Sequence, residues 1–166
     1  MASPRKVVIG DLETGEYVEL QFNPQKLKLS LEASWSRVQT PGSSFQDLQF
    51  GGTGNIIFEE FEVRYDALGA AGPDLIDKQN FLLSLLYPPQ DVDAVATGAP
   101  PRVLVSWPGW IAVKTTVPKI EIDFSRFAFD GEPTPTYFTA KVKLEERRTT
   151  RIGFSQVRQR GLRRTA

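Results

Sequence analysis

The sequence predicts a mainly β protein, an antiparallel β-sandwich or barrel with one α-helix on its flank. Apolar and polar residues alternate over several short stretches, which is the period of a strand that buries one face. Turn-forming residues separate about seven such stretches, and one helical pattern lies between two of them. A chain of 166 residues has the size of a single domain.

The first two strands are expected to form a hairpin. Residues 6–11 and 16–22 each have a strand pattern, and residues 13–15 between them read as a turn. The second strand ends at Asn23 and Pro24, because proline has no N–H for the ladder and biases the preceding residue away from the helical region. We therefore assign Asn23 and Pro24 to a structural turn.

The most regular strand pattern runs from Lys26 to Trp35, where five apolar residues alternate with polar ones. Burial of those five side chains would contribute on the order of 8 kcal/mol before the entropy cost. We predict one continuous strand here, with a core-facing row made of Leu27, Leu29, Leu31, Ala33 and Trp35.

Residues 39–54 are rich in Gly, Ser and Thr, yet they carry three large apolar side chains, Phe45, Leu48 and Phe50. Long loops with spaced apolar residues are uncommon in compact domains and are usually functional. We interpret this stretch as a loop that docks on a neighbouring subunit. The alternative is that the three side chains fold back onto their own core, and the sequence does not distinguish the two.

A strand over residues 55–65 is followed by the predicted helix. Gly72 is an acceptable N-cap, Pro73 fits the first helical position, and Asp74 favours the positive end of the helix dipole. Phe81 falls on the polar side, where it is either an exposed residue of a monomer or a contact with an adjacent protomer. The helix ends before Pro88-Pro89, and its buried stripe is predicted as Leu75, Ile76, Leu82, Leu83 and Leu86.

Two long strands near the end of the chain are expected to pair as a hairpin. The stretch that opens at Trp110 changes phase at Pro118, which is consistent with a bulge or an edge position. Asp130, Gly131 and Pro133 then form a structural turn before a last strand that ends at Glu145. Its buried face is predicted as Phe138, Ala140, Val142 and Leu144.

The composition argues against an enzyme. The chain has no cysteine and no histidine, so thiolate nucleophiles, the commonest zinc ligands and the commonest general base are missing. The carboxylate pairs Glu59-Glu60 and Glu145-Glu146 are adjacent on strands and point to opposite faces. We expect no catalytic residue, no cofactor and no metal. No leader or membrane-length apolar run is recognised, so we expect a protein that is soluble in the cytoplasm.

The tryptophans give an alternative from a different functional class, a carbohydrate-binding β-sandwich module. Sugar rings stack on exposed tryptophans, and Trp110, beside Pro108-Gly109, has an exposed setting. Trp35 and Trp107 end apolar strand faces, so we interpret both as core residues.

Charge is distributed unevenly along the chain. Its 20 basic and 20 acidic side chains cancel, but residues 147–166 hold seven arginines and no acid, which leaves 13 basic against 20 acidic groups before them. We divide the chain into a β domain, 1–146, and an Arg-rich C-terminal tail, 147–166. A solvated tail or a phosphate-binding tail is possible, but few aromatic residues accompany the arginines and nucleic acid is not an expected partner. We favour contact with an acidic surface of a neighbouring subunit, either in the same ring or in the next ring, through Arg147, Arg148, Arg151, Arg158, Arg160, Arg163 and Arg164.

Three motifs together resemble the N-terminal domain of the tube-initiator, or hub-adaptor, proteins of contractile injection systems. They are the Phe22-Asn23-Pro24 turn followed by a Trp-bearing strand, the strand of residues 102–107, and the aromatic-rich strand that meets Asp130-Gly131-Glu132-Pro133 before a final strand ending in Glu. The resemblance covers residues 8–146.

This resemblance implies a phage tail-tube fold, in which a hexameric ring of the chain closes a continuous inner barrel. It implies a structural role in the baseplate of the assembled particle, joining a spike of the VgrG type to the inner tube proteins, with baseplate wedge proteins as further neighbours. The alternative within this class is the inner tube subunit itself. Many members continue into a LysM domain where this sequence has its Arg-rich segment, so peptidoglycan binding does not carry over.

Overall fold

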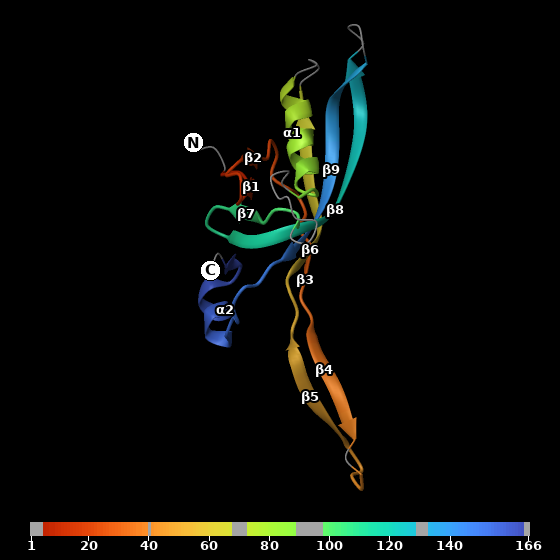
Figure 1. Cartoon of the computed structure of the whole chain (residues 1–166), viewed down its shortest axis with the longest axis vertical. Coiled ribbons are helices and arrows are strands. Elements are labelled where there is room, and N and C mark those ends of the chain that lie inside the picture. The colour runs from red at the N-terminus through yellow and green to blue at the C-terminus, as the bar shows by residue number, and fades with distance from the viewer. Residues whose placement is uncertain (1–4, 40, 68–72, 89–97, 129–132, 165–166) are drawn as a thin grey trace.

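The computed structural model describes residues 5–39, 41–67, 73–88, 98–128 and 133–164 (Figure 1). Its two helices are α1 (Pro73–Ser84) and α2 (Phe154–Arg160). Its strands are β1 (Val8–Asp11), β2 (Tyr17–Glu19), β3 (Leu29–Ser30), β4 (Ala33–Gln39), β5 (Gln46–Thr53), β6 (Ile57–Asp66), β7 (Val103–Trp107), β8 (Ile111–Ala128), β9 (Thr134–Glu146) and β10 (Arg163–Arg164).

Most strands belong to one sheet, with the order β2-β1-β7-β8-β9-β6-β3 and with β10 paired to β8. The strands β4 and β5 form a separate two-stranded sheet. Pairing is antiparallel except between β10 and β8. The predicted mainly β, antiparallel fold with a helix on its flank is therefore confirmed.

Strand β8 takes part in two layers of the molecule. Residues 111–115 pair with β7, and residues 115–128 pair with β9. The register with β9 shifts between Thr116 and Lys119, on either side of Pro118, so the predicted irregularity is confirmed. Figure 1 shows β8 turning at this place, which sets β1, β2 and β7 against the layer of β9 and β6.

The core fills the space between these two layers. The predicted buried face of the last strand is confirmed, because Phe138, Ala140, Val142 and Leu144 are all buried. Buried side chains of the first layer include Ile9, Val18, Val105, Ile111 and Val113, and those of the second include Phe58, Phe61, Val63 and Tyr65.

Tyr65 links three elements at one end of the core. Its hydroxyl donates a hydrogen bond to the backbone carbonyl of Glu19, at 3.1 Å. The Lys78 ammonium of α1 lies 4.9 Å from the centre of its ring. Burial raises the pKa of the Tyr65 hydroxyl well above its ordinary value, and the neighbouring Glu19 charge raises it further. The side chain therefore stays protonated and serves as a hydrogen-bond donor between β6 and β2.

Helix α1 covers one side of the core with a stripe that differs in part from the predicted one. Leu75 and Leu82 are buried as expected. Ile76 was predicted to be buried but is exposed, and Leu85 takes a fully buried place instead. The helix is therefore rotated relative to the predicted stripe, and the side that carries Asp74, Asp77 and Phe81 borders β2 across a groove.

The predicted continuous strand from Lys26 to Trp35 is wrong. The segment forms β3 and then β4, and the two strands belong to different sheets. Leu29, Leu31 and Trp35, predicted to face the core, are all exposed. Alternating apolar residues predict a strand with one covered face. No other part of the described chain covers Leu29, Leu31 and Trp35, so these side chains are exposed.

Phe138 tests the packing of the core, because it is fully buried and its ring lies 5.2 Å from Tyr65 and 6.0 Å from Phe124, centre to centre. We expect Phe138→Ala to lower the free energy of unfolding by about 3–5 kcal/mol, since it removes a fully buried ring and leaves a cavity. Urea unfolding measures the change. Phe127→Ala is the control, because the Phe127 ring is exposed and its loss is expected to cost less than about 0.5 kcal/mol. Equal losses for the two variants would contradict this account of the core.

Candidate assembly interface

The strands β4 and β5 form a hairpin that extends beyond the rest of the molecule (Figure 1). In its register Trp35 lies opposite Phe50, and Arg37 lies opposite Leu48. Residues directly opposite one another share a face of the ladder, and so do alternate residues of one strand. Trp35, Leu48 and Phe50 therefore lie on the same face, with the rings of Trp35 and Phe50 5.2 Å apart.

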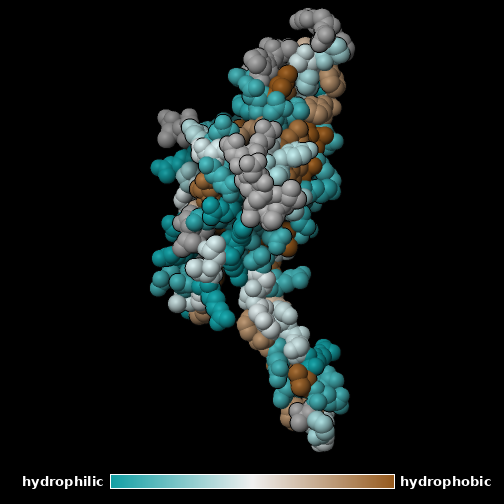
Figure 2. Space-filling model, viewed as in Figure 1, coloured by the Kyte–Doolittle hydropathy of each residue, from teal (hydrophilic) through white to brown (hydrophobic). Residues whose placement is uncertain are grey.

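This face has no cover within the described chain. Trp35 is 57% exposed, Leu48 60% and Phe50 58%, and Phe45, just before β5, is 68% exposed. Figure 2 shows brown, hydrophobic patches on the hairpin among hydrophilic side chains. A two-stranded hairpin is marginally stable in water by itself, and an exposed aromatic cluster of this kind marks a contact surface. We refer to Trp35, Leu48 and Phe50 as the hairpin face, and Phe45 lies in the turn just before β5.

The prediction of a loop over residues 39–54 is wrong, because residues 46–53 form β5. The glycines that suggested a loop are compatible with a strand here: Gly51 lies close to Ser34, and Gly52 has a φ of +144° beside an irregularity in the pairing. The alternative in which Phe45, Leu48 and Phe50 fold back onto their own core is also wrong, since all three are exposed. Docking on a neighbour remains a prediction.

A buried carboxylate ties the base of the hairpin to the end of β9. Glu146 is 3% exposed, and its Oε2 accepts hydrogen bonds from the Ile56 backbone N–H, at 3.0 Å, and from Arg148 Nε, at 2.9 Å. Arg148 Nη1 also donates to the carbonyl of Thr53, the last residue of β5, at 3.4 Å. These contacts connect the end of β5, the start of β6 and the segment after β9, so they hold the hairpin in a defined direction.

The Arg-rich segment is folded along the sheet over residues 147–164. Both of its ends bond to β8: the Arg147 N–H donates to the Lys114 carbonyl at 2.9 Å, and the Leu162 carbonyl accepts from the Ala112 N–H at 3.0 Å. Between these points lies α2, and β10 follows it. Sequence reasoning missed both elements, although the i, i+3 spacing of Phe154 and Val157 was a helix signal.

The predicted interface arginines have different surroundings. Arg148 is engaged by Glu146 within its own chain, as described above. Arg164 lies in β10. The others, Arg147, Arg151, Arg158, Arg160 and Arg163, are exposed to solvent.

Phe81 is not the exposed residue that helical periodicity suggested. It is partly buried and packs against the core. The side of α1 that was predicted to be polar lies beside β2, where Phe81 lines a groove together with Tyr17 and Val18. Its contact within the chain explains the apolar residue at this position, and a further contact with a neighbouring protomer remains a prediction.

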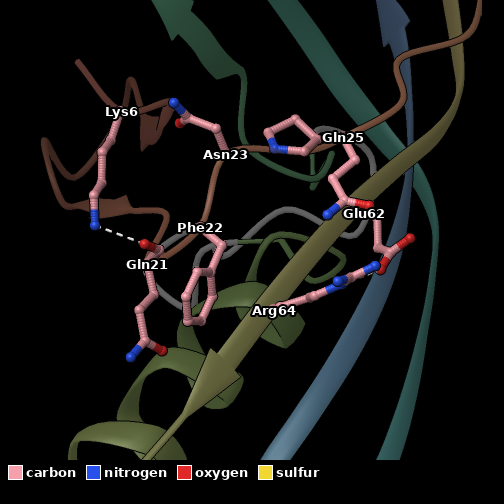
Figure 3. Close-up of a pocket in the computed structure, with 8 residues that line it drawn as sticks. Lys6, Gln21, Phe22, Asn23, Gln25, Glu62 and Arg64 are labelled. Carbon is pink, nitrogen blue, oxygen red and sulfur yellow. Dashed lines mark hydrogen bonds and ion pairs between the residues drawn. The ribbon is translucent and has the colours of Figure 1, made fainter. Parts of the chain in front are cut away.

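The Asn23-Pro24 turn holds the start of the chain against β2. Asn23 Oδ1 accepts a hydrogen bond from the Val7 N–H, and its Nδ2 donates to the Arg5 carbonyl, both at 3.1 Å. Figure 3 shows the pocket of 320 Å³ beside this turn, where Lys6 Nζ donates to the Gln21 carbonyl at 2.6 Å. Of the second predicted turn, Asp130 and Gly131 lie outside the described residues, and Pro133 directly precedes β9.

Two charged groups of this pocket are paired with each other, and the third, Lys6, bonds to a backbone carbonyl. Glu62 and Arg64 form an ion pair on its wall (Figure 3), and the hydrogen bond from that pair raises the pKa of Arg64. The carboxylate pairs noted in the sequence are also engaged: Glu59 with Lys143, Glu60 with Lys26, and Glu146 with Arg148. In the described part of the chain, no three carboxylates come together as a metal site.

The three tryptophans do not form one stacking platform. Trp35, predicted to be a core residue, is on the exposed hairpin, which corrects that assignment. Trp107 packs against the core, and Trp110 is half exposed, as predicted. The rings of Trp107 and Trp110 are 5.1 Å apart at 61°, edge to face, so they offer no shared flat surface for a sugar. Neither α1 nor α2 is long and apolar enough to cross a membrane.

Comparison with known proteins identifies a family. Residues 8–152 match the family model described as contractile injection system tube protein. No curated protein matches the sequence.

We expect the hairpin face to contribute to contacts between molecules and not to the stability of the isolated chain. In the isolated chain, Leu48→Ser with Phe50→Ser should change the free energy of unfolding by less than about 1 kcal/mol, because both side chains are already exposed. In assembled protein, the same variant should lower the yield of assemblies measured by size exclusion with light scattering.

The matched control for this test is Gln49→Ser, which changes the opposite face of β5. Hydrogen exchange gives a second readout, since amides of β4 and β5 should exchange quickly in the isolated chain and slowly in assemblies. Equal protection of the hairpin in both states, or full assembly by the double variant, would contradict the docking interpretation.

The ion pair at the base of the hairpin is expected to contribute to stability. We expect Arg148→Ala to lower the free energy of unfolding by about 2–4 kcal/mol, because it removes the guanidinium that pairs with the buried Glu146 carboxylate. Urea unfolding measures this loss. Arg151→Ala is the control, because Arg151 is exposed and its removal should cost less than about 0.5 kcal/mol. If Arg148→Ala had the same free energy of unfolding as the control, the ion pair between Arg148 and Glu146 would not contribute to stability.

Proposed function

The chain belongs to the contractile injection system tube protein family, and from this premise we propose that it forms the ring that joins the spike to the inner tube. In this role it is a baseplate hub or tube initiator with no catalytic step. Its partners are further copies of itself in a hexameric ring, a spike protein of the VgrG type on one side and inner tube proteins on the other. Baseplate wedge proteins are outer neighbours.

The observation that supports a role in assembly is the hairpin face. Its three large apolar side chains, two of them aromatic, are exposed, as is Phe45 beside them, on an element that contacts the rest of the described chain only at its base. Transfer of one such side chain from water to a packed contact is worth about 1.5–3 kcal/mol. A partner that covers the hairpin face therefore gains several times that amount, repeated at each subunit of a ring.

The hairpin is also placed to reach a different molecule. It extends from one end of the body, while the paired ends of β8 and β9 extend from the opposite end (Figure 1). Two projections in opposite directions suit a subunit that has one partner above it and one below. Such contacts are heterologous, and they give closed rings or stacked tubes according to the rotation between subunits.

The inner tube subunit itself is the alternative within the same family, and the family match fits it equally well. The two roles differ in their axial partners. An initiator has unlike partners at its two ends, so the purified protein should stop at one ring or a pair of rings. A tube subunit has like partners at both ends and can continue to stack.

The test is the assembly state of the purified chain, measured by light scattering after size exclusion and by negative-stain images of the peak. We expect rings with a central hole that do not extend by themselves but do extend when inner tube protein is added. Open-ended tubes from the chain alone would overturn the initiator assignment in favour of the tube subunit. A strict monomer in the presence of both spike and tube protein would overturn the structural role.

A further inference from the structure

Helix α2 buries none of its residues against the described part of its own chain. It has seven residues and exposes Phe154 (79%) and Val157 on one side. Helices shorter than about 12 residues are marginal in water unless they pack on something. Gln156 caps its start by accepting the Gly153 N–H at 3.0 Å, and Arg158 lies over the Phe154 ring at 5.7 Å. The helix thus presents an aromatic residue framed by guanidinium groups.

A groove between β2 and α1 has the opposite charge to α2. It measures 580 Å³, and the exposed Tyr17 and the partly buried Phe81 give it apolar walls. Four carboxylates also line it, Glu16, Glu19, Asp74 and Asp77. None of these four side chains forms an ion pair among the described residues. The one cation on its wall, Lys78, is directed over the Tyr65 ring.

The groove and the helix lie at opposite edges of one layer. In that layer β2 is followed by β1, β7 and the first part of β8, and β10 pairs with β8 at Ala112 and Val113. The groove borders β2, whereas α2 leads into β10. Figure 1 shows α2 on the other side of β7 from β2 and α1. A chain therefore cannot place its own α2 in its own groove, but two copies set side by side can bring the two together.

We propose that α2 of one copy docks in the β2–α1 groove of the next copy, with Phe154 and Val157 against Tyr17 and Phe81 and with Arg158 and Arg160 facing Asp74 and Asp77. The occupant is a second copy of this chain because the groove is acidic and the helix is basic, both carry apolar residues, and the described part of one chain leaves both exposed. The contact is head-to-tail, so its repetition generates a ring. It rests on the ring-forming function proposed above and names the lateral contact of that ring.

The proposed contact should depend on salt concentration, because it joins surfaces of opposite charge. Opposite charges on the two surfaces speed encounter and set the register of docking, and both effects weaken as salt screens the charges. The apolar contact beneath them is less sensitive to salt. Lateral association should therefore slow with added salt before it is lost.

Disulfide trapping tests the contact directly, because the chain has no cysteine of its own. The full chain is made as Tyr17→Cys and as Val157→Cys, and the two are mixed under mild oxidation. We expect a covalent heterodimer in at least about tenfold excess over the control mixture of Tyr17→Cys with Ser125→Cys, which is exposed on β8. The chain carrying both Tyr17→Cys and Val157→Cys should give a ladder of oligomers on a non-reducing gel.

Charge reversal identifies the ionic part of the contact. Arg158→Glu with Arg160→Glu on the Val157→Cys chain, or Asp74→Lys with Asp77→Lys on the Tyr17→Cys chain, should each reduce the cross-link about tenfold or more. Mixing the two reversed chains should restore it. Failure of either reversal to reduce the cross-link, or of the mixture to restore it, would overturn the assignment of charges.

The outcomes separate this contact from the ring itself. Rings in negative stain without cross-link above the control would overturn the α2 contact and leave the proposed function standing. A cross-link without rings would support the contact and count against ring formation, and the absence of both would overturn both. Retention of duplex DNA by the wild type but not by Arg158→Glu with Arg160→Glu, together with a cross-link no greater than the control, would assign α2 to nucleic acid and overturn the proposal.

Discussion

The structure depends on one strand, β8, which is shared by two layers. Its first residues pair with β7 and its later residues pair with β9, and the register shift around Pro118 lets it change direction between the two. A proline inside a ladder removes one hydrogen bond, so it belongs where pairing is already interrupted. Because the strand turns there, the apolar faces of both layers meet and a core forms without a second independent sheet. The helix α1 then covers one side of that core.

Around this closed core, two elements point their apolar surface outward. The hairpin of β4 and β5 and the short helix α2 both belong to parts of the chain with few contacts to the rest. Each is attached by polar contacts at its base: the Glu146 carboxylate with Arg148 and Ile56 for the hairpin, and hydrogen bonds to the β8 backbone for the segment that carries α2. The molecule is thus a closed core with two projecting elements, and the cost of exposing apolar side chains is offset where other chains cover them.

The sequence predicted correctly those elements whose apolar side chains are buried against other parts of the same chain. The alternation of Phe138, Ala140, Val142 and Leu144 was sufficient for β9, and the phase change at Pro118 predicted the irregular pairing of β8 but not its change of direction. The same alternation gave a wrong prediction for Leu29, Leu31 and Trp35. A period of two indicates that one face of a strand is covered, but it does not indicate whether the same chain or another chain covers it. Helical periodicity placed Ile76 inside and Phe81 outside, since it cannot include β2, which borders the side of α1 across a groove. The helix α2 was missed because an excess of arginine suggested a solvated tail.

The hairpin buries nothing of the core, and its strand pairing is local in sequence. Substitutions on its apolar face therefore carry little penalty for the folding of the body, while they change the surface offered to a partner. Selection can therefore act on the two parts almost separately, because changes in the core affect the fold and changes in the hairpin affect the exposed surface. A tube protein built this way can change partners by replacement of about twenty residues. Replacement of a binding loop changes the specificity of a fixed scaffold in the same way.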